Sequence, residues 1–377
     1  MKKIKVGTLF SGIGAPEWAL KRLSYPHETL LACDNGDVDI SKKIDAKTER
    51  EKVATMSNFE EEKKYVDELY EKNSSKHNFV KDSYLANYPE FDESNYFKDV
   101  TLLNGKPLKG KIDLLIGGSP CQSFSTVGFQ AGLNDARGNL FFEFVRLVDE
   151  IKPSVFIYEN VTGIRSKKNS ENWAKMWKVM EELGYELWCE GLNAKDYGIP
   201  QIRNRIFVVG FRDKGYLPKN KNEFAPKQII NGLTMQDFLI ESTKFGGVGY
   251  DSNGALTFSK EPGVIESKYY LTPAVKRYVL KDGTKNWHTK IETDRSIART
   301  LLSTMGNHHR AGVDNYVTIN GELRSLSERE CLRLMGFTDD FKIVVSKAQM
   351  YKQAGNSMVV DVVMALLKSI KNTGVFD

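Results

Sequence analysis

The first 212 residues are predicted to form an α/β fold around a mostly parallel sheet, because strand-like and helix-like runs alternate along them. The strand-like runs are short and apolar, and Gly, Pro or polar residues bound them. The helix-like runs between them carry one apolar face each, which predicts helices on both faces of the sheet. Beyond residue 212 the alternation stops, and short β-like runs predict a second, smaller domain that is irregular and partly β.

The chain begins with a strand–turn–helix–strand unit of the kind that binds nucleotides. Residues 4–10 (IKVGTLF) form a short apolar strand, and SGIGAP follows as a turn. Residues 17–23 then predict a helix with Trp18 on its apolar side, and the apolar run 30–33 predicts a second strand that ends at Asp34.

Residues 41–98 differ in composition from their surroundings. They are rich in Lys, Glu, Asp, Asn and Tyr and poor in Ile, Leu and Val. The run 47–72 predicts a solvated helix. We favour a charged surface insertion between two strands over an accessory arm that contacts DNA.

The alternation then resumes. Residues 112–118 predict a strand that ends in Gly-Gly, and 139–152 predict a helix stopped by Pro153. Strands at 154–160, 185–194 and 205–211 and a helix at 173–184 complete the first domain, residues 1–212.

The rest of the chain divides into three parts. Residues 213–322 hold few long apolar periods and short β-like runs such as 316–319, and we interpret them as the smaller domain. Residues 323–352 return to helical signals and predict a supporting hinge region, and residues 353–377 predict a final helix that returns to the first domain.

Composition excludes several classes of protein. The 377 residues are 41% hydrophobic and 27% charged with a net charge of +5, which permits a nucleic-acid partner without requiring one. The four cysteines form no CxxC motif, and no apolar stretch approaches a membrane span, so we expect a cytoplasmic protein in a reducing compartment. No Cys or acid completes a ligand set with His308 and His309, so no metal is expected.

Three groups of residues that could take part in catalysis follow or begin predicted strands. Cys121 lies in GGSPCQSFS, just beyond a buried strand, where open α/β sheets bind ligands. Glu159 stands at the carboxyl end of another strand, where a carboxylate is costly unless it is paired or used. Arg203 and Arg205 begin a third strand, and their spacing places both side chains on one face. By itself each could be structural.

The turn FSGIGA is a weak glycine-rich signal. It lacks a complete GxGxxG, and Asp34 ends the next strand, where ribose hydroxyls are usually held. Taken alone, this pair of features fits a nicotinamide dehydrogenase equally well.

The order of the motifs along the chain indicates a function far more specifically than any single motif does. FSGIG, GGSPCQSFS, ENV, QIRNR and QAGNS, read from residue 8 to about 365, resemble the motifs of DNA (cytosine-5)-methyltransferases. The resemblance implies a Rossmann-like sheet that uses S-adenosyl-L-methionine, with residues 213–322 as a target-recognition domain. It also implies transfer of a methyl group to carbon 5 of a cytosine flipped out of a short, specific duplex DNA sequence.

The same resemblance implies a covalent mechanism. Cys121 attacks carbon 6 of cytosine, and Glu159 holds ring atom N3 and the exocyclic amine. Arg205 contacts the carbonyl oxygen of the base, and Arg203 supports the site.

The implied cofactor site draws on both ends of the chain. Its residues are Phe10, Ser11, Gly12, Ile13, Gly14, Asp34, Asp99, Val100, Pro120, Leu140, Asn356 and Met358. Phe10 is expected near the adenine, Asp34 at the ribose and Asp99 at the adenine amine. Thr8 departs from the family pattern, because many relatives carry an acid there that contacts the amino group of the cofactor.

The implied DNA contacts fall in two regions. The loop from Gln122 to Arg137 is expected to close over DNA and help extrude the base, which must leave the stack to expose its faces. The expected DNA-binding residues are Gln122, Ser123, Ser125, Arg203, Thr300 and Arg310. Arg295 and Arg299 are further candidates for phosphate or guanine contacts.

Two rivals share these motifs: a cytosine-5 methyltransferase that acts on transfer RNA, and an inactive relative that only binds DNA. The length of residues 213–322 favours double-stranded DNA as the partner, and the presence of Cys121, Glu159 and Arg205 favours an active enzyme. We expect a monomer on DNA, associated with the nucleoid of a bacterial or phage-infected cell. The resemblance also admits a cognate restriction endonuclease as a partner that acts on the same sequence.

Overall fold

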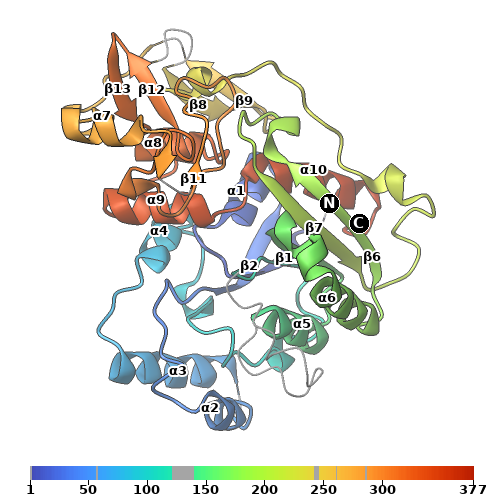
Figure 1. The fold of residues 1–377 in the computed structure, drawn as a ribbon. Coiled ribbons are helices and arrows are strands. Elements are labelled where there is room, and N and C mark those ends of the chain that lie inside the picture. Colours follow the sequence, from blue (N-terminus) through green and yellow to red (C-terminus); the bar gives the residue numbers. More distant parts are fainter. Residues whose placement is uncertain (1, 57, 121–139, 242–245, 260, 285–286) are drawn as a thin grey trace.

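A seven-stranded sheet forms the centre of the protein, which was described from a computed structural model (Figure 1). The structure describes residues 2–56, 58–120, 140–241, 246–259, 261–284 and 287–377. The strand order is β3-β2-β1-β4-β5-β7-β6. The strands are β1 (Ile4–Leu9), β2 (His27–Cys33), β3 (Tyr96–Phe97), β4 (Leu114–Gly117), β5 (Val155–Val161), β6 (Glu186–Asn193) and β7 (Asn204–Phe211).

Strands β1 to β5 pair in parallel, as the sequence predicts. Strand β7 runs antiparallel to both β5 and β6, so the far edge of the sheet is a hairpin extension rather than another parallel unit. The carboxyl ends of β1, β2, β4 and β5 therefore meet along one edge of the sheet, where such folds bind ligands.

Helices cover both faces of the sheet (Figure 1). Alternate residues of β4 pack into two separate hydrophobic cores on opposite faces of the sheet. Leu114 and Ile116 belong to one cluster, and Leu115 belongs to the other. The first cluster includes helices α1 (Ala15–Arg22) and α10 (Val360–Asn372), and the second includes α5 (Leu140–Ile151) and α6 (Ser170–Glu182).

The charged insertion corrects one expectation. The run 47–72 forms two helices, α2 (Ala46–Val53) and α3 (Phe59–Asn73), and not one; α4 (Phe79–Asn87) follows. Helix α3 is also less solvated than predicted, because Glu62, Val66 and Tyr70 are buried at intervals of four residues. Val66 and Tyr70 belong to the same core cluster as α5, so the insertion packs on the sheet domain.

Short hairpins and helices joined by irregular segments follow residue 211, and the hairpins lie in the upper part of the molecule in Figure 1. The described strands are β8 (Gly247–Tyr250) with β9 (Leu256–Ser259), β10 (Gly283–Thr284) with β11 (Trp287–His288), and β12 (Tyr316–Ile319) with β13 (Glu322–Ser325). The helices are α7 (Pro273–Val279), α8 (Glu328–Arg333) and α9 (Lys347–Asn356). This agrees with an irregular, partly β region followed by helices.

The two ends of the chain pack together. Helix α10 lies beside α1 (Figure 1), and the buried Arg22 of α1 forms a two-pronged ion pair with Asp361 of α10 at 2.8 and 3.0 Å. In the described residues no helix is long and apolar enough to cross a membrane.

Candidate active site

A hollow opens at the carboxyl edge of the sheet, where both ends of the chain meet. The turn after β1 contributes Phe10, Ser11 and Gly12 to its wall, and the segment after α9 contributes Asn356 and Met358. The remaining lining residues are Thr8, Leu9, Ala15, Pro16, Ile116, Gly118, Glu159 and Ser357. The structure therefore brings five predicted cofactor residues beside the predicted catalytic acid.

The turn after β1 has an unusual backbone. Phe10, Gly12 and Gly14 have φ angles of 54°, 53° and 78°, so the chain curls tightly before α1 begins. A left-handed conformation costs little for glycine and more for Phe10, which holds it at the wall of the hollow. Ser11 secures the turn, because its hydroxyl accepts from the Cys33 N–H at 2.8 Å.

Two predicted acids follow neighbouring strands. Asp34 comes directly after β2 and accepts hydrogen bonds from the N–H groups of Gly12 at 2.9 Å and Gly36 at 2.8 Å. Asp99 lies two residues after β3 and accepts from Thr101 at 2.8 and 2.7 Å. Burial raises the pKa of both carboxyl groups, and these hydrogen bonds oppose the rise by favouring the ionised form.

The segment that leads to Cys121 is held from β5. Asn160 donates to the Tyr158 hydroxyl at 2.7 Å and to the Ser119 carbonyl at 3.3 Å, and the Ser119 and Tyr158 hydroxyls lie 2.8 Å apart. A larger residue at Gly118 would displace the ends of two side chains of the hollow, because a Cβ there would lie 2.9 Å from Glu159 Oε2 and 3.2 Å from Met358 Cε. No sequence signal pointed to this role for Asn160.

Glu159 and Arg205 face each other across β5 and β7. Arg205 Nε lies 3.1 Å from Glu159 Oε1, and both side chains are mostly buried. Burial raises the pKa of Glu159, while the charges of Arg205 and Arg203 oppose that rise. A carboxyl group in this environment can carry a proton and still be oriented by its guanidinium partner.

Arg203 is buried and acts as a clamp. Its guanidinium donates to the carbonyl oxygens of Leu301 at 3.1 Å, Gly355 at 3.0 Å and Ser357 at 2.8 Å. Burial lowers its pKa to about 9, and the charge of Arg205 adds to the effect. Its described contacts fix the chain around the hollow, which is a positioning role, and its predicted contact with DNA stays a prediction.

Position 8 carries no acid, but the Thr8 side chain is hydrogen-bonded to a buried acid, Glu17. The Thr8 hydroxyl and the Tyr84 hydroxyl both reach Glu17 Oε1, at 2.9 and 2.7 Å. Glu17 is 1% exposed, and burial raises its pKa. The sequence reasoning missed this residue, since its partners come from β1 and from the insertion.

The other predicted residues are more scattered. Ile13 and Val100 are buried, Leu140 begins α5, and Pro120 is exposed. The described lining of the hollow includes none of these four residues, and it also lacks Gly14, Asp34 and Asp99. Cys121, Gln122, Ser123 and Ser125 lie outside the described residues.

The predicted recognition residues contact other parts of the protein chain. The Thr300 hydroxyl donates to the Ile202 carbonyl at 2.6 Å, which joins this region to the chain just before β7. The Arg310 guanidinium lies 5.0 Å from the centre of the Tyr278 ring. Arg295 and Arg299 both pair with Glu292.

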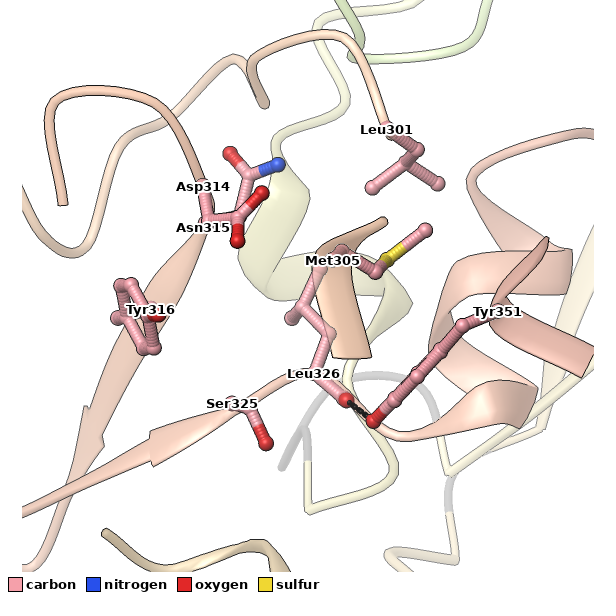
Figure 2. A pocket seen from close by; sticks show the side chains of 8 residues that line it. All are labelled: Leu301, Met305, Asp314, Asn315, Tyr316, Ser325, Leu326 and Tyr351. Atoms are coloured by element: carbon pink, nitrogen blue, oxygen red, sulfur yellow. Dashed lines mark hydrogen bonds between the residues drawn. The ribbon is translucent and has the colours of Figure 1, made fainter. Parts of the chain in front are cut away.

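A second, smaller hollow lies among α9, β12 and β13 (Figure 2). Its wall includes Met305, Asp314, Leu326 and Tyr351, and the Tyr351 hydroxyl donates to the Leu326 carbonyl. Across the described ranges, His, Cys, Asp and Glu side chains form no cluster of three that could hold a metal ion.

Comparison with known proteins places these features in one family. The chain is 34% identical over 292 residues to the type II methyltransferase M.HhaI of Haemophilus parahaemolyticus, covering 78% of this chain and 84% of that protein. It is 33% identical over 277 residues to M.FnuDI of Fusobacterium nucleatum, covering 70% and 77%.

Solved structures show the same fold. Dnmt2 methyltransferase of S. pombe superimposes with a TM-score of 0.63 over 98% of both chains at 18% identity. The methyltransferase EhMeth of Entamoeba histolytica gives 0.65 at 15% identity, covering 99% of both chains. The model of the C-5 cytosine-specific DNA methylase family matches residues 4–372, and this protein therefore belongs to that family.

Proposed function

We propose that this DNA cytosine-5 methyltransferase uses Cys121 as its nucleophile and Glu159 as the group that holds the cytosine ring. The supporting observation is that Glu159, which pairs with Arg205, lines the hollow formed by both chain ends. Gly118 lies close enough to Glu159 that a Cβ on it would be 2.9 Å from the carboxyl group, and it stands three residues before Cys121; three residues extend at most about 10 Å.

The hollow suits S-adenosyl-L-methionine. Its glycine turn allows close approach of a ligand to the backbone, and Gly118 has no space for a side chain. Phe10, Gly12, Asn356 and Met358 would hold the cofactor. When bound, it supplies an activated methyl group.

The reaction needs a base that has left the duplex, because the thiol and the methyl donor approach opposite faces of the ring. The Cys121 thiolate forms a bond to carbon 6, and a proton held by Glu159 at N3 neutralises the ring as its electrons move to carbon 5. Carbon 5 then takes the methyl group. Loss of the carbon 5 proton to water re-forms the double bond and expels Cys121.

The residues around the reacting ring divide the work between them. Arg205 orients the Glu159 carboxyl group and can reach the carbonyl oxygen of the base. Arg203 holds the wall of the hollow in place through three main-chain carbonyls. Thr300 and Arg310 remain our candidates for DNA contacts in a recognition domain formed by residues 213–322.

The proposed setting follows from the bacterial type II relatives. We place the enzyme in the cytoplasm of a bacterial or phage-infected cell, as a monomer on DNA, beside a restriction endonuclease that cuts the same sequence. Bisulfite sequencing of plasmid DNA from an expressing host should reveal one short methylated motif.

Covalent trapping tests the nucleophile. Duplexes that carry 5-fluorocytosine in the methylated motif should attach to the wild-type enzyme and not to Cys121→Ser. The serine variant should lose about a thousandfold or more of its turnover while it still binds duplex and cofactor. Near-normal methylation by Cys121→Ser would refute the covalent step, and methylation of total transfer RNA without methylation of duplex DNA would refute the DNA substrate.

A further inference from the structure

The insertion is anchored at Asp99, the residue predicted to accept the adenine amine of the cofactor. Tyr70 of α3 donates its hydroxyl hydrogen to Asp99 Oδ2 at 2.9 Å, and the Tyr70 side chain is 5% exposed. Arg50 of α2 donates to the Thr101 carbonyl at 2.6 Å, and Asn104 donates to Glu62 of α3 at 3.0 Å. Polar side chains of the insertion thus contact the segment 99–104 at three points.

A second anchor lies at the other predicted acid. Asn78, which caps α4, donates to the Asp34 carbonyl at 3.0 Å. Gly36 is required there, since a Cβ at this position would lie 2.0 Å from Asn78 Oδ1. The insertion therefore contacts both Asp34 and Asp99, the two acids that follow β2 and β3.

The bonding at Asp99 leaves a defined site free. An ionised carboxylate has about four acceptor positions. Thr101 occupies two of them at Oδ1, and Tyr70 occupies one at Oδ2. Among the residues that the structure describes, one acceptor position of Oδ2 remains, and its direction is set because Tyr70 holds the other.

We propose that Tyr70 is a positioning residue that fixes Asp99 to accept the exocyclic amine of adenine, so that the charged insertion makes the cofactor site selective for adenine. This inference rests on the proposed function, because it assigns the cofactor pocket to the same hollow. The amine of adenine donates to a carboxylate, whereas hypoxanthine presents a carbonyl oxygen there and is repelled.

The matched control comes from the same insertion. Tyr65 also donates its hydroxyl to a carboxylate, that of Glu49, but this pair joins α3 to α2 and does not contact Asp99. Tyr70→Phe and Tyr65→Phe therefore each remove one tyrosine–carboxylate hydrogen bond and retain the ring. Only the first changes the carboxylate proposed to bind adenine.

The test measures binding of two ligands by calorimetry on the full-length protein. S-adenosylhomocysteine carries the amine, and S-inosylhomocysteine carries oxygen in its place. Tyr70→Phe should raise the Kd of the adenosyl ligand about tenfold and leave that of the inosyl ligand nearly unchanged, because one charge-assisted hydrogen bond no longer orients the acceptor. Tyr65→Phe should leave both values near those of the wild type.

Three outcomes separate the possible failures. A Tyr70→Phe protein that binds both ligands as the wild type does, or that weakens both equally, would overturn the positioning role. If Asp99→Asn keeps the preference for the adenosyl ligand, the role of Asp99 is wrong. A wild-type protein that binds neither ligand would refute the proposed function itself. In the double variant Tyr70→Phe/Asp99→Asn, the two losses of affinity for the adenosyl ligand should not add, since both substitutions act on one hydrogen-bonded acceptor.

Discussion

The acids of the site could be foreseen individually, but their partners could not. Asp34 and Glu159 stand at the ends of apolar runs, and the carboxyl ends of neighbouring strands meet at one edge of a sheet. Glu17, Tyr70 and Asn160 carry no such signal, because each acts through a hydrogen bond to a residue whose position depends on the folded sheet. Cys121, the residue of greatest chemical interest, lies outside the described residues, so its place remains a prediction.

The proposed role of Glu159 as a proton donor predicts the effect of replacing it. Glu159→Gln keeps the shape of the side chain but cannot deliver a proton to N3, and it removes the charge that faces Arg205. Methylation should fall by about 10²- to 10⁴-fold, the usual contribution of a positioned acid. Single-turnover kinetics with saturating DNA and labelled cofactor would measure the loss.

Glu190→Gln is the matched control, because Glu190 lies on the edge strand β6, which is separated from β5 by β7, and is exposed. Its turnover should stay near that of the wild type. Binding of S-adenosylhomocysteine by Glu159→Gln should also be nearly normal. A Glu159→Gln enzyme that methylates at the wild-type rate would exclude Glu159 as the acid.

At the scale of elements, strong periodicity predicted the helices and strands well. The antiparallel direction of strand β7 was not predicted. The runs that became β6 and β7 are separated only by residues 194–203, whereas a parallel connection needs a dozen or more residues. That short spacing was the available signal for an antiparallel hairpin. In the insertion, the abundance of charge concealed the buried face of α3, since one of its inward positions is itself an acid, Glu62.

The carboxyl group of Asp314 should make the stability of the region around β12 depend on pH. Asp314 lines the second hollow (Figure 2). Burial raises the pKa of Asp314 from 3.8 to about 6, while the His309 N–H, which donates to its Oδ2 at 2.9 Å, opposes that rise. A raised folded-state pKa means that the protonated form suits the fold better. The stabilising contribution is therefore complete below pH 3.8 and is lost as the pH rises through about 6.

Asp314→Asn should remove that dependence, because the amide oxygen can still accept from His309 and carries no charge. Relative to the wild type, the variant should gain roughly 1–3 kcal/mol of unfolding free energy between pH 4.5 and pH 7.5. Urea unfolding at the two pH values would measure it. Asp213→Asn alters a side chain that is 62% exposed and should show little difference between them; an equal gain in both variants would contradict the assignment.

On the scale of the whole molecule, the fold depends on joining its two ends, which sequence reasoning foresaw from motifs near residues 10 and 356. The physical means of joining them was not foreseen. Arg22 is fully buried and, besides Asp361, donates to the carbonyls of Gly336 at 2.9 Å and Gly254 at 2.6 Å. One guanidinium thus connects the first helix, the last helix and two segments of the second half of the chain, including the region proposed to recognise DNA.

Asp361→Asn tests this junction with almost no change in side-chain volume. It leaves the Arg22 charge buried without a counter-charge, which should lower the free energy of unfolding by about 3–5 kcal/mol. Asp340→Asn breaks the ion pair of the neighbouring residue Lys21, at 3.2 Å, whose side chains are 41% and 50% exposed, and should cost less than about 1 kcal/mol. Denaturant unfolding of both variants would give the comparison. Because the junction also holds α10 beside the hollow, Asp361→Asn should weaken S-adenosylhomocysteine binding, whereas equal stability of the two variants would show that the buried pair does not join the ends.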